Sequence, residues 1–148
     1  MYKRQRDFPP GQLSVEFINV GGWLTSGDLA LDSCAQFLAV AEHRLILSRA
    51  RSVCHQLRRA GHHSVWAPAC QDKIAGGHAG VGVISLGGAP LTLPSFVTPQ
   101  FQEFFRLGRV LRTTLPTSHG GVVHLFVVYG YQGAEDDSDL VLLMLILL

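Results

Sequence analysis

The hydrophobic positions of the chain fall into short runs, and charged residues directly follow the most informative of these runs. Five consecutive apolar residues, 37–41, lead straight into Glu42, His43 and Arg44. A run of this length is typical of a buried strand, although periodicity alone also allows a buried helical segment. As a strand, it places Glu42 at its C-terminal end, where open α/β sheets bind their ligands.

The other hydrophobic patterns predict strands that alternate with short helices. Residues 14–20 alternate in polarity and carry β-branched and aromatic side chains, which is typical of a strand. Residues 48–60 repeat apolar side chains at helical spacing and end at Gly61. A short helix is predicted within 25–32, with Ser26 or Asp28 as its N-cap. Strands are predicted over 63–68 and 80–86, with a glycine-rich loop over 75–79 before the second of them. One or two helical turns are predicted over 100–107.

Two β-rich runs late in the chain predict a hairpin. Residues 109–115 and 122–131 flank a loop that contains Gly120 and Gly121, which favours an antiparallel pair. Crossover helices therefore come first and hairpins later. This order predicts an α/β (α+β) architecture with a mixed sheet and flanking helices.

Composition and charge narrow the functional classes. The 148 residues are 47% hydrophobic and 16% charged, which predicts a folded domain with a core rather than a disordered chain. The net charge of +1 conceals an asymmetry, because four of the 11 acidic residues lie within 135–139. Residues 1–134 carry 12 Lys and Arg against seven Asp and Glu, a net charge of +5. This mildly favours a phosphate-rich partner but is weaker than the charge of a dedicated DNA-binding domain.

The cysteines indicate a cellular compartment, and the two ends of the chain indicate where the folded domain begins and ends. Cys34, Cys54 and Cys70 are odd in number and form no C-x-x-C motif, which favours a reducing, intracellular compartment. Residues 1–12 are basic and lack an apolar segment, so we interpret them as a flexible leader and not a secretory signal. The apolar residues 140–148 are too few for a helix that spans a membrane, and we expect a chain that is cut short there.

Several common catalytic motifs lack their required context. The glycines within 76–82 lead into a predicted strand, whereas a phosphate-binding glycine loop opens a helix. The cysteines and histidines around 54–70 match no structural zinc spacing. No serine lies in a G-x-S-x-G motif, so a hydrolase triad has no nucleophile.

Polar side chains remain at the ends of three predicted strands, namely Asn19, Glu42 and Tyr129 or Tyr131. Carboxylate and amide oxygens suit Mg²⁺, which keeps several waters and needs only one or two carboxylates. Each residue also has an ordinary explanation: a turn for Asn19, a helix N-terminal charge for Glu42 and a sheet position for Tyr129. The residues alone leave both interpretations open.

Four short motifs occur in an order and spacing that resemble a known family. They are Asn-Val-Gly at 19–21, Ala-Glu-His at 41–43, Gly-Val-Gly-Val-Ile at 80–84 and Val-Tyr-Gly-Tyr-Gln-Gly at 128–133. The series resembles the N-terminal half of the endonuclease/exonuclease/phosphatase superfamily, which has the DNase I-like fold. Its general sequence pattern is also similar to that of the endonuclease domains of retroelements.

The resemblance implies a partial two-sheet sandwich over 13–139 and a phosphodiesterase that hydrolyses nucleic acid with Mg²⁺, or with Mn²⁺ as an alternative ion. It implies that Glu42 binds the metal and that Asn19 positions the metal or the phosphate. By the same resemblance, Tyr129 would contact the scissile phosphate.

The sequence departs from the family pattern at several positions. Ala41 and His43 stand where Gln and Thr are common, and Gly21 stands where a second polar residue is frequent. The Gly-Asp-x-Asn strand and the late Asp-His pair of the family would lie beyond residue 148. We therefore expect the chain by itself to be inactive, because one glutamate cannot both bind the metal and activate water. The alternatives are a non-catalytic binding module or decayed gene product of the same fold, and an inositol or lipid phosphatase of the superfamily.

Overall fold

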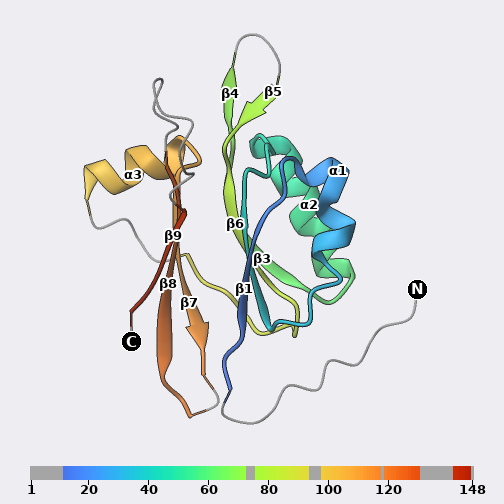
Figure 1. Ribbon diagram of the computed structural model, residues 1–148, viewed down its shortest axis with the longest axis vertical. Coiled ribbons are helices and arrows are strands. Elements are labelled where there is room, and N and C mark those ends of the chain that lie inside the picture. Colours follow the sequence, from blue (N-terminus) through green and yellow to red (C-terminus); the bar gives the residue numbers. More distant parts are fainter. Residues whose placement is uncertain (1–11, 73–75, 94–97, 118, 131–141, 148) are drawn as a thin grey trace.

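Two β-sheets face each other, and two helices cover the outer face of the first sheet (Figure 1). The computed structural model describes residues 12–72, 76–93, 98–117, 119–130 and 142–147, so residues 1–11 of the predicted leader and the whole acidic segment 135–139 lie outside the described residues. The strands are β1 (Val15–Asn19), β2 (Phe37–Ala41), β3 (His63–Ala67), β4 (Cys70–Asp72), β5 (Gly76–His78), β6 (Val81–Ser85), β7 (Val110–Pro116), β8 (Val122–Tyr129) and β9 (Leu142–Leu147). The helices are α1 (Trp23–Ala30), α2 (Leu47–Arg59) and α3 (Pro99–Arg106).

The first sheet is mixed, as the sequence predicts. Its strand order is β1-β2-β6-β3, with β1 parallel to β2 and with β6 antiparallel to both β2 and β3. In this register Asn19 lies opposite Ala41. The parallel pairing of β1 and β2 therefore brings Asn19 and the residue after Ala41, Glu42, to the same edge of the sheet.

The second sheet has the order β7-β8-β9 and contains the predicted hairpin. Part of the apolar tail forms its third strand, since β9 runs antiparallel to β8 and Leu142 lies opposite Tyr129. One prediction is wrong here. The segment 75–79 is not simply a loop, because Gly76–His78 pairs with Cys70–Asp72 in a small separate hairpin.

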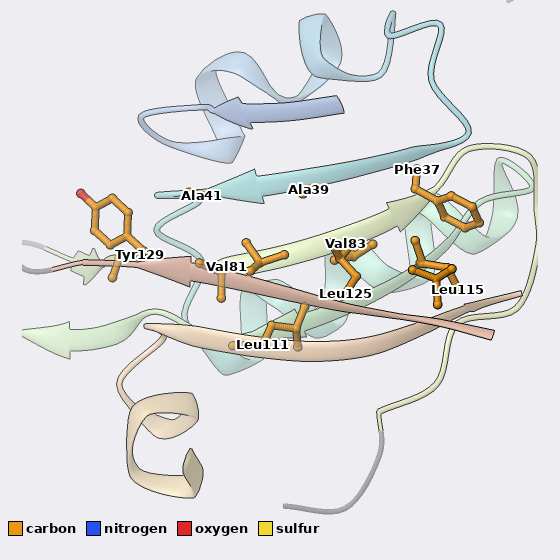
Figure 2. Packing of buried hydrophobic residues seen from close by; sticks show 13 residues of the cluster. Phe37, Ala39, Ala41, Val81, Val83, Leu111, Leu115, Leu125 and Tyr129 are labelled. Atoms are coloured by element: carbon orange, nitrogen blue, oxygen red, sulfur yellow. The ribbon is translucent and has the colours of Figure 1, made fainter. Parts of the chain in front are cut away.

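The main core lies between the two sheets (Figure 2). Phe37 and Ala39 from β2 and Val83 from β6 face Leu111 of β7 and Leu125 of β8. The alternate β2 residues Leu38 and Val40 belong instead to the core under α1 and α2. All five residues of β2 are thus buried, which explains why this strand is a continuous apolar run and does not alternate.

The helices differ from expectation mainly at their ends. α1 begins at Trp23, and its N-cap is Gly22 with φ 127° and no capping side chain, so the prediction of Ser26 or Asp28 as N-cap is wrong. α2 starts one residue earlier than predicted, and Gly61 follows it with φ 87°, as glycines after helices often do. No helix in the described ranges combines the length and the apolar character needed to cross a bilayer.

Candidate functional site

The segment that follows β2 has an unusual backbone. Glu42 and Arg44 both have φ 57°, a left-handed conformation that few residues other than glycine adopt. Backbone hydrogen bonds hold the turn on both sides: the N–H of Arg44 donates to the carbonyl of Ala79 at 3.0 Å, and the N–H of Trp23 donates to the carbonyl of His43 at 2.9 Å. The neighbouring strands therefore fix the direction in which these side chains project.

His43 anchors the turn from beneath. Its Nδ1 accepts from the N–H of Leu45 at 2.9 Å, and its Nε2 is 3.0 Å from the carbonyl oxygen of Ala67, so the ring is neutral with its proton on Nε2. The ring is buried against Trp66, with centroids 5.0 Å apart. Burial lowers the pKa of His43 from 6.5 to about 4, against the opposing effect of the backbone hydrogen bonds.

Glu42 carries the negative charge of the candidate site. The Nη2 of Arg44 lies 2.6 Å from its Oε1, and this hydrogen bond is the main reason that the pKa of Glu42 lies below its usual value. Hydrogen bonding from the side chains of Asn19 and Tyr129 lowers this pKa further, although partial burial opposes the shift. α2 begins five residues later and has no acidic residue in its first turn, so the interpretation of Glu42 as a helix N-terminal charge is wrong.

Asn19 interacts with two partners in this arrangement. Its Oδ1 accepts from the N–H of Gly21 at 3.0 Å, which is the turn expected of an asparagine at a strand end. With the oxygen engaged, the amide nitrogen is the group that donates toward Glu42. The explanation as a turn residue is therefore correct, and it is compatible with a position in the site.

Tyr129 reaches the same place from the second sheet. Its ring is largely buried, and Figure 2 shows its hydroxyl at the end of the sandwich where β2 ends at Ala41. Burial raises the pKa of Tyr129, and the charge of Glu42 raises it further, so the phenol keeps its proton at neutral pH. The guanidinium of Arg109 lies 5.1 Å from the centre of the ring. Tyr131, the alternative considered from the sequence, lies outside the described residues.

Arg44 and Arg109 are two charged neighbours that the sequence patterns did not single out. Arg109 is fixed beneath the tyrosine, because its Nη1 donates to the carbonyl of Gly130 at 2.9 Å. Arg44 is adjacent to a predicted site residue in the sequence. The only feature of the sequence that could have indicated Arg44 was its position two residues after Glu42. Its ion pair with Glu42 depends on a left-handed turn that no local pattern indicates.

Comparison with solved structures identifies proteins with a similar fold. A 3′-5′ exonuclease from Neisseria meningitidis matches with a TM-score of 0.51 and 20% identity over 70% of this chain and 38% of that chain. An AP endonuclease from Leishmania major matches with a TM-score of 0.50 and 19% identity over 79% of this chain and 40% of that chain. An AP endonuclease from Archaeoglobus fulgidus has a TM-score of 0.50 and 17% identity over 69% and 37% of the two chains.

The chain has the DNase I-like fold. The mixed α+β architecture predicted from the sequence is confirmed by the same comparisons. The chain spans about two fifths of the length of these nucleases. Neither a comparison with protein-family models nor a search of curated proteins finds a match.

The oxygen atoms at this end of the DNase I-like sandwich fit one hard divalent cation. Among the residues that the structure describes, no three His, Cys, Asp or Glu side chains gather into a closed metal site. Glu42 nevertheless offers an ionised carboxylate beside an amide and a phenol, and Mg²⁺ accepts a single carboxylate when water completes its shell. Arg44 is a competitor for this ion, because its guanidinium is already paired with the carboxylate.

Proposed function

We propose that this chain supplies one half of a divalent-metal-dependent nuclease active site that hydrolyses phosphodiester bonds in nucleic acid. One observation carries the proposal: Asn19, Glu42 and Tyr129 come from three strands in two sheets and interact around one ionised carboxylate at the end of the sandwich. The likeness of the fold to three nucleases supports the choice of substrate.

Glu42 would hold Mg²⁺ or Mn²⁺, and Asn19 would keep the carboxylate in position. A bound ion would polarise a phosphate oxygen. The protonated hydroxyl of Tyr129 can donate to another phosphate oxygen, because the raised pKa of Tyr129 keeps the phenol neutral. Among the described residues, the side chains that act on Glu42 are those of Arg44, Asn19 and Tyr129, and none of them is a carboxylate or a histidine that could serve as general base. The complementary half of the site would therefore come from residues other than these.

The Glu42–Arg44 ion pair favours one second candidate, a non-catalytic binding module with the same fold. The guanidinium neutralises the carboxylate without any metal, and it leaves Arg44 half-exposed at the end of the sandwich. In such a module the charge pair would be structural and substitution of Glu42 would affect the turn but not ion binding.

Replacing Glu42 by glutamine should abolish binding of Mn²⁺ as followed by electron paramagnetic resonance. The variant retains the size of the side chain and one acceptor oxygen but removes the negative charge on which a single-carboxylate site depends. Glu103→Gln is the matched control, since Glu103 is an exposed glutamate paired with Arg106 at 2.6 Å on α3. Equal Mn²⁺ affinity in wild type and Glu42→Gln would contradict the proposal.

Nicking of supercoiled plasmid separates the nuclease from the binding module. We expect the 148-residue chain to leave plasmid intact in Mg²⁺, and a form extended downstream to nick it in a manner that depends on Glu42. Absence of nicking by the extended form would favour the second candidate, and nicking that does not depend on Glu42 would contradict the proposed site.

Replacing Arg44 by glutamine should raise the affinity for Mn²⁺ several-fold. The substitution removes a positive charge that competes for Oε1 of Glu42, and exposed ion pairs of this kind are worth up to about 1 kcal/mol. Titration of Mn²⁺ into wild type and Arg44→Gln at constant ionic strength measures the change. Weaker binding in the variant would show that Arg44 orients the carboxylate and does not compete with the ion.

A further inference from the structure

The exposed side of α2 is strongly basic and is not part of the candidate site. It carries Arg49, Arg51, His55, Arg58 and Arg59, here called the basic face of α2, and the 13 residues of this helix include no acidic side chain. The apolar residues Ala50, Val53 and Leu57 point the opposite way and are buried against the first sheet. Figure 1 shows α2 on the side of that sheet away from the second sheet.

The arginines of the basic face have no acidic partner in the part of the chain that the structure describes. Among the described residues, the four arginines take part in no ion pair or side-chain hydrogen bond. Arg51 and Arg59 are two helical steps of four apart, so they lie along one line about 12 Å long with His55 between them.

The helix dipole explains only part of this charge. Arg58 and Arg59 lie in the last turn, where positive charge is favourable. Arg49 lies in the first turn and Arg51 in the next, where the dipole disfavours positive charge and no acidic residue compensates. A structural function therefore does not account for the basic charge at the start of α2.

We propose that the basic face of α2 is a second contact surface for the phosphate backbone of double-stranded nucleic acid. Duplex DNA presents about one negative charge per 1.7 Å of its axis, which is complementary to a line of unpaired arginines. α2 starts three residues after Arg44, so the basic face begins close to the candidate site and extends away from it. The inference deepens the proposed function and rests on it only for the choice of nucleic acid as partner.

An anionic membrane is the less suitable partner. Helices that lie on a membrane insert an apolar face between the lipids. The apolar side of α2 is already used in the protein core, and Leu47 is the one large apolar residue that it exposes. The surface thus provides charge without the hydrophobic side chains that insertion requires.

The test measures binding of a short fluorescein-labelled random-sequence duplex by anisotropy, in EDTA and at several KCl concentrations. Arg51→Gln/Arg59→Gln should reduce affinity on the order of tenfold at low salt and make the slope of log K against log[KCl] shallower by about 2. Arg51→Lys/Arg59→Lys should retain the wild-type slope, because a phosphate contact requires charge and not a particular shape. The single variant Arg51→Gln should lose more affinity than Arg106→Gln, which removes the same charge from the exposed end of α3.

Two further measurements separate this inference from its alternatives. The inference would be overturned if Arg51→Gln/Arg59→Gln bound the duplex with wild-type affinity, or if its loss of affinity were no larger than that of Arg106→Gln. Arginine-dependent binding that is tighter to phosphatidylserine vesicles than to the duplex would also overturn it. The midpoint of urea unfolding should be unchanged in the glutamine variants, which excludes a loss of fold. Because the assay contains EDTA and no metal, its result does not depend on metal binding at Glu42, so failure of the metal site and failure of the basic face are distinguishable.

Discussion

Replacing Gly80 by alanine should lower the free energy of unfolding by about 3 kcal/mol. Gly80 has φ 92°, and a Cβ built on it would lie 2.3 Å from Cε1 and 2.6 Å from Nδ1 of His43. The left-handed backbone contributes about 1–2 kcal/mol to the loss, and the overpacking contributes about 1–3 kcal/mol. The imidazole cannot move aside cheaply, because both of its nitrogens are engaged in hydrogen bonds.

Gly61→Ala provides the matched control for this substitution. Gly61 has φ 87°, but no atom lies within 4 Å of a Cβ built there. The control variant therefore keeps the backbone cost and lacks the steric one, and we expect a loss of about 1–2 kcal/mol. Urea unfolding of both variants tests the difference. Equal losses would show that His43 relaxes freely and that the ring is not fixed beneath the turn.

The sequence was most informative where burial and local pattern agree. β2 was predicted with its observed bounds because a strand buried on both faces is a continuous apolar run. α2 was predicted within one residue because its apolar side chains repeat at helical spacing. The hairpin of β7 and β8 followed from a Gly-bearing loop between two β-rich runs.

The sequence was less informative where tertiary contacts determine the local structure. α1 begins without a capping side chain, and the hydrogen bond from the N–H of Trp23 to the carbonyl of His43 satisfies its first turn instead. The β4–β5 hairpin is rich in glycine because Gly77 lies against the backbone of Arg44, where a Cβ would be 2.6 Å from the carbonyl oxygen. Such close approaches depend on residues far apart in the chain.

Local pattern determines one part of the candidate site, and tertiary contacts determine the rest. The proximity of Asn19 and Glu42 follows from parallel pairing of adjacent strands, which a correct sequence-based topology would predict. Tyr129 comes from the second sheet, so its position depends on how the sheets pack; the strand-end pattern left Tyr129 and Tyr131 as alternatives, and the family resemblance favoured Tyr129. The ion pair of Glu42 with Arg44 is accompanied by a left-handed backbone at both residues, and no pattern in the sequence indicates this.

Acidification should destabilise the protein through His43. The pKa of its imidazole is about 4 in the folded protein, against an ordinary value of 6.5. Between these two pH values the unfolded chain binds more protons than the folded protein. The contribution of neutral His43 to the free energy of unfolding is therefore complete above pH 6.5 and is lost as the pH falls towards 4. Over this window the difference amounts to about 3 kcal/mol.

Urea unfolding at pH 7 and pH 4.5 measures this effect, with two variants to assign it. His43→Gln removes the titration, so its free energy of unfolding should be lower at pH 7 but nearly constant through the window. His55→Gln removes an exposed histidine of α2 and should retain the full acid sensitivity of wild type. Acid loss of the same size in His43→Gln would place the sensitivity elsewhere. The turn that carries Glu42 is hydrogen-bonded to the neutral ring through Leu45, so protonation of His43 would loosen the candidate site at the same time as the core beneath it.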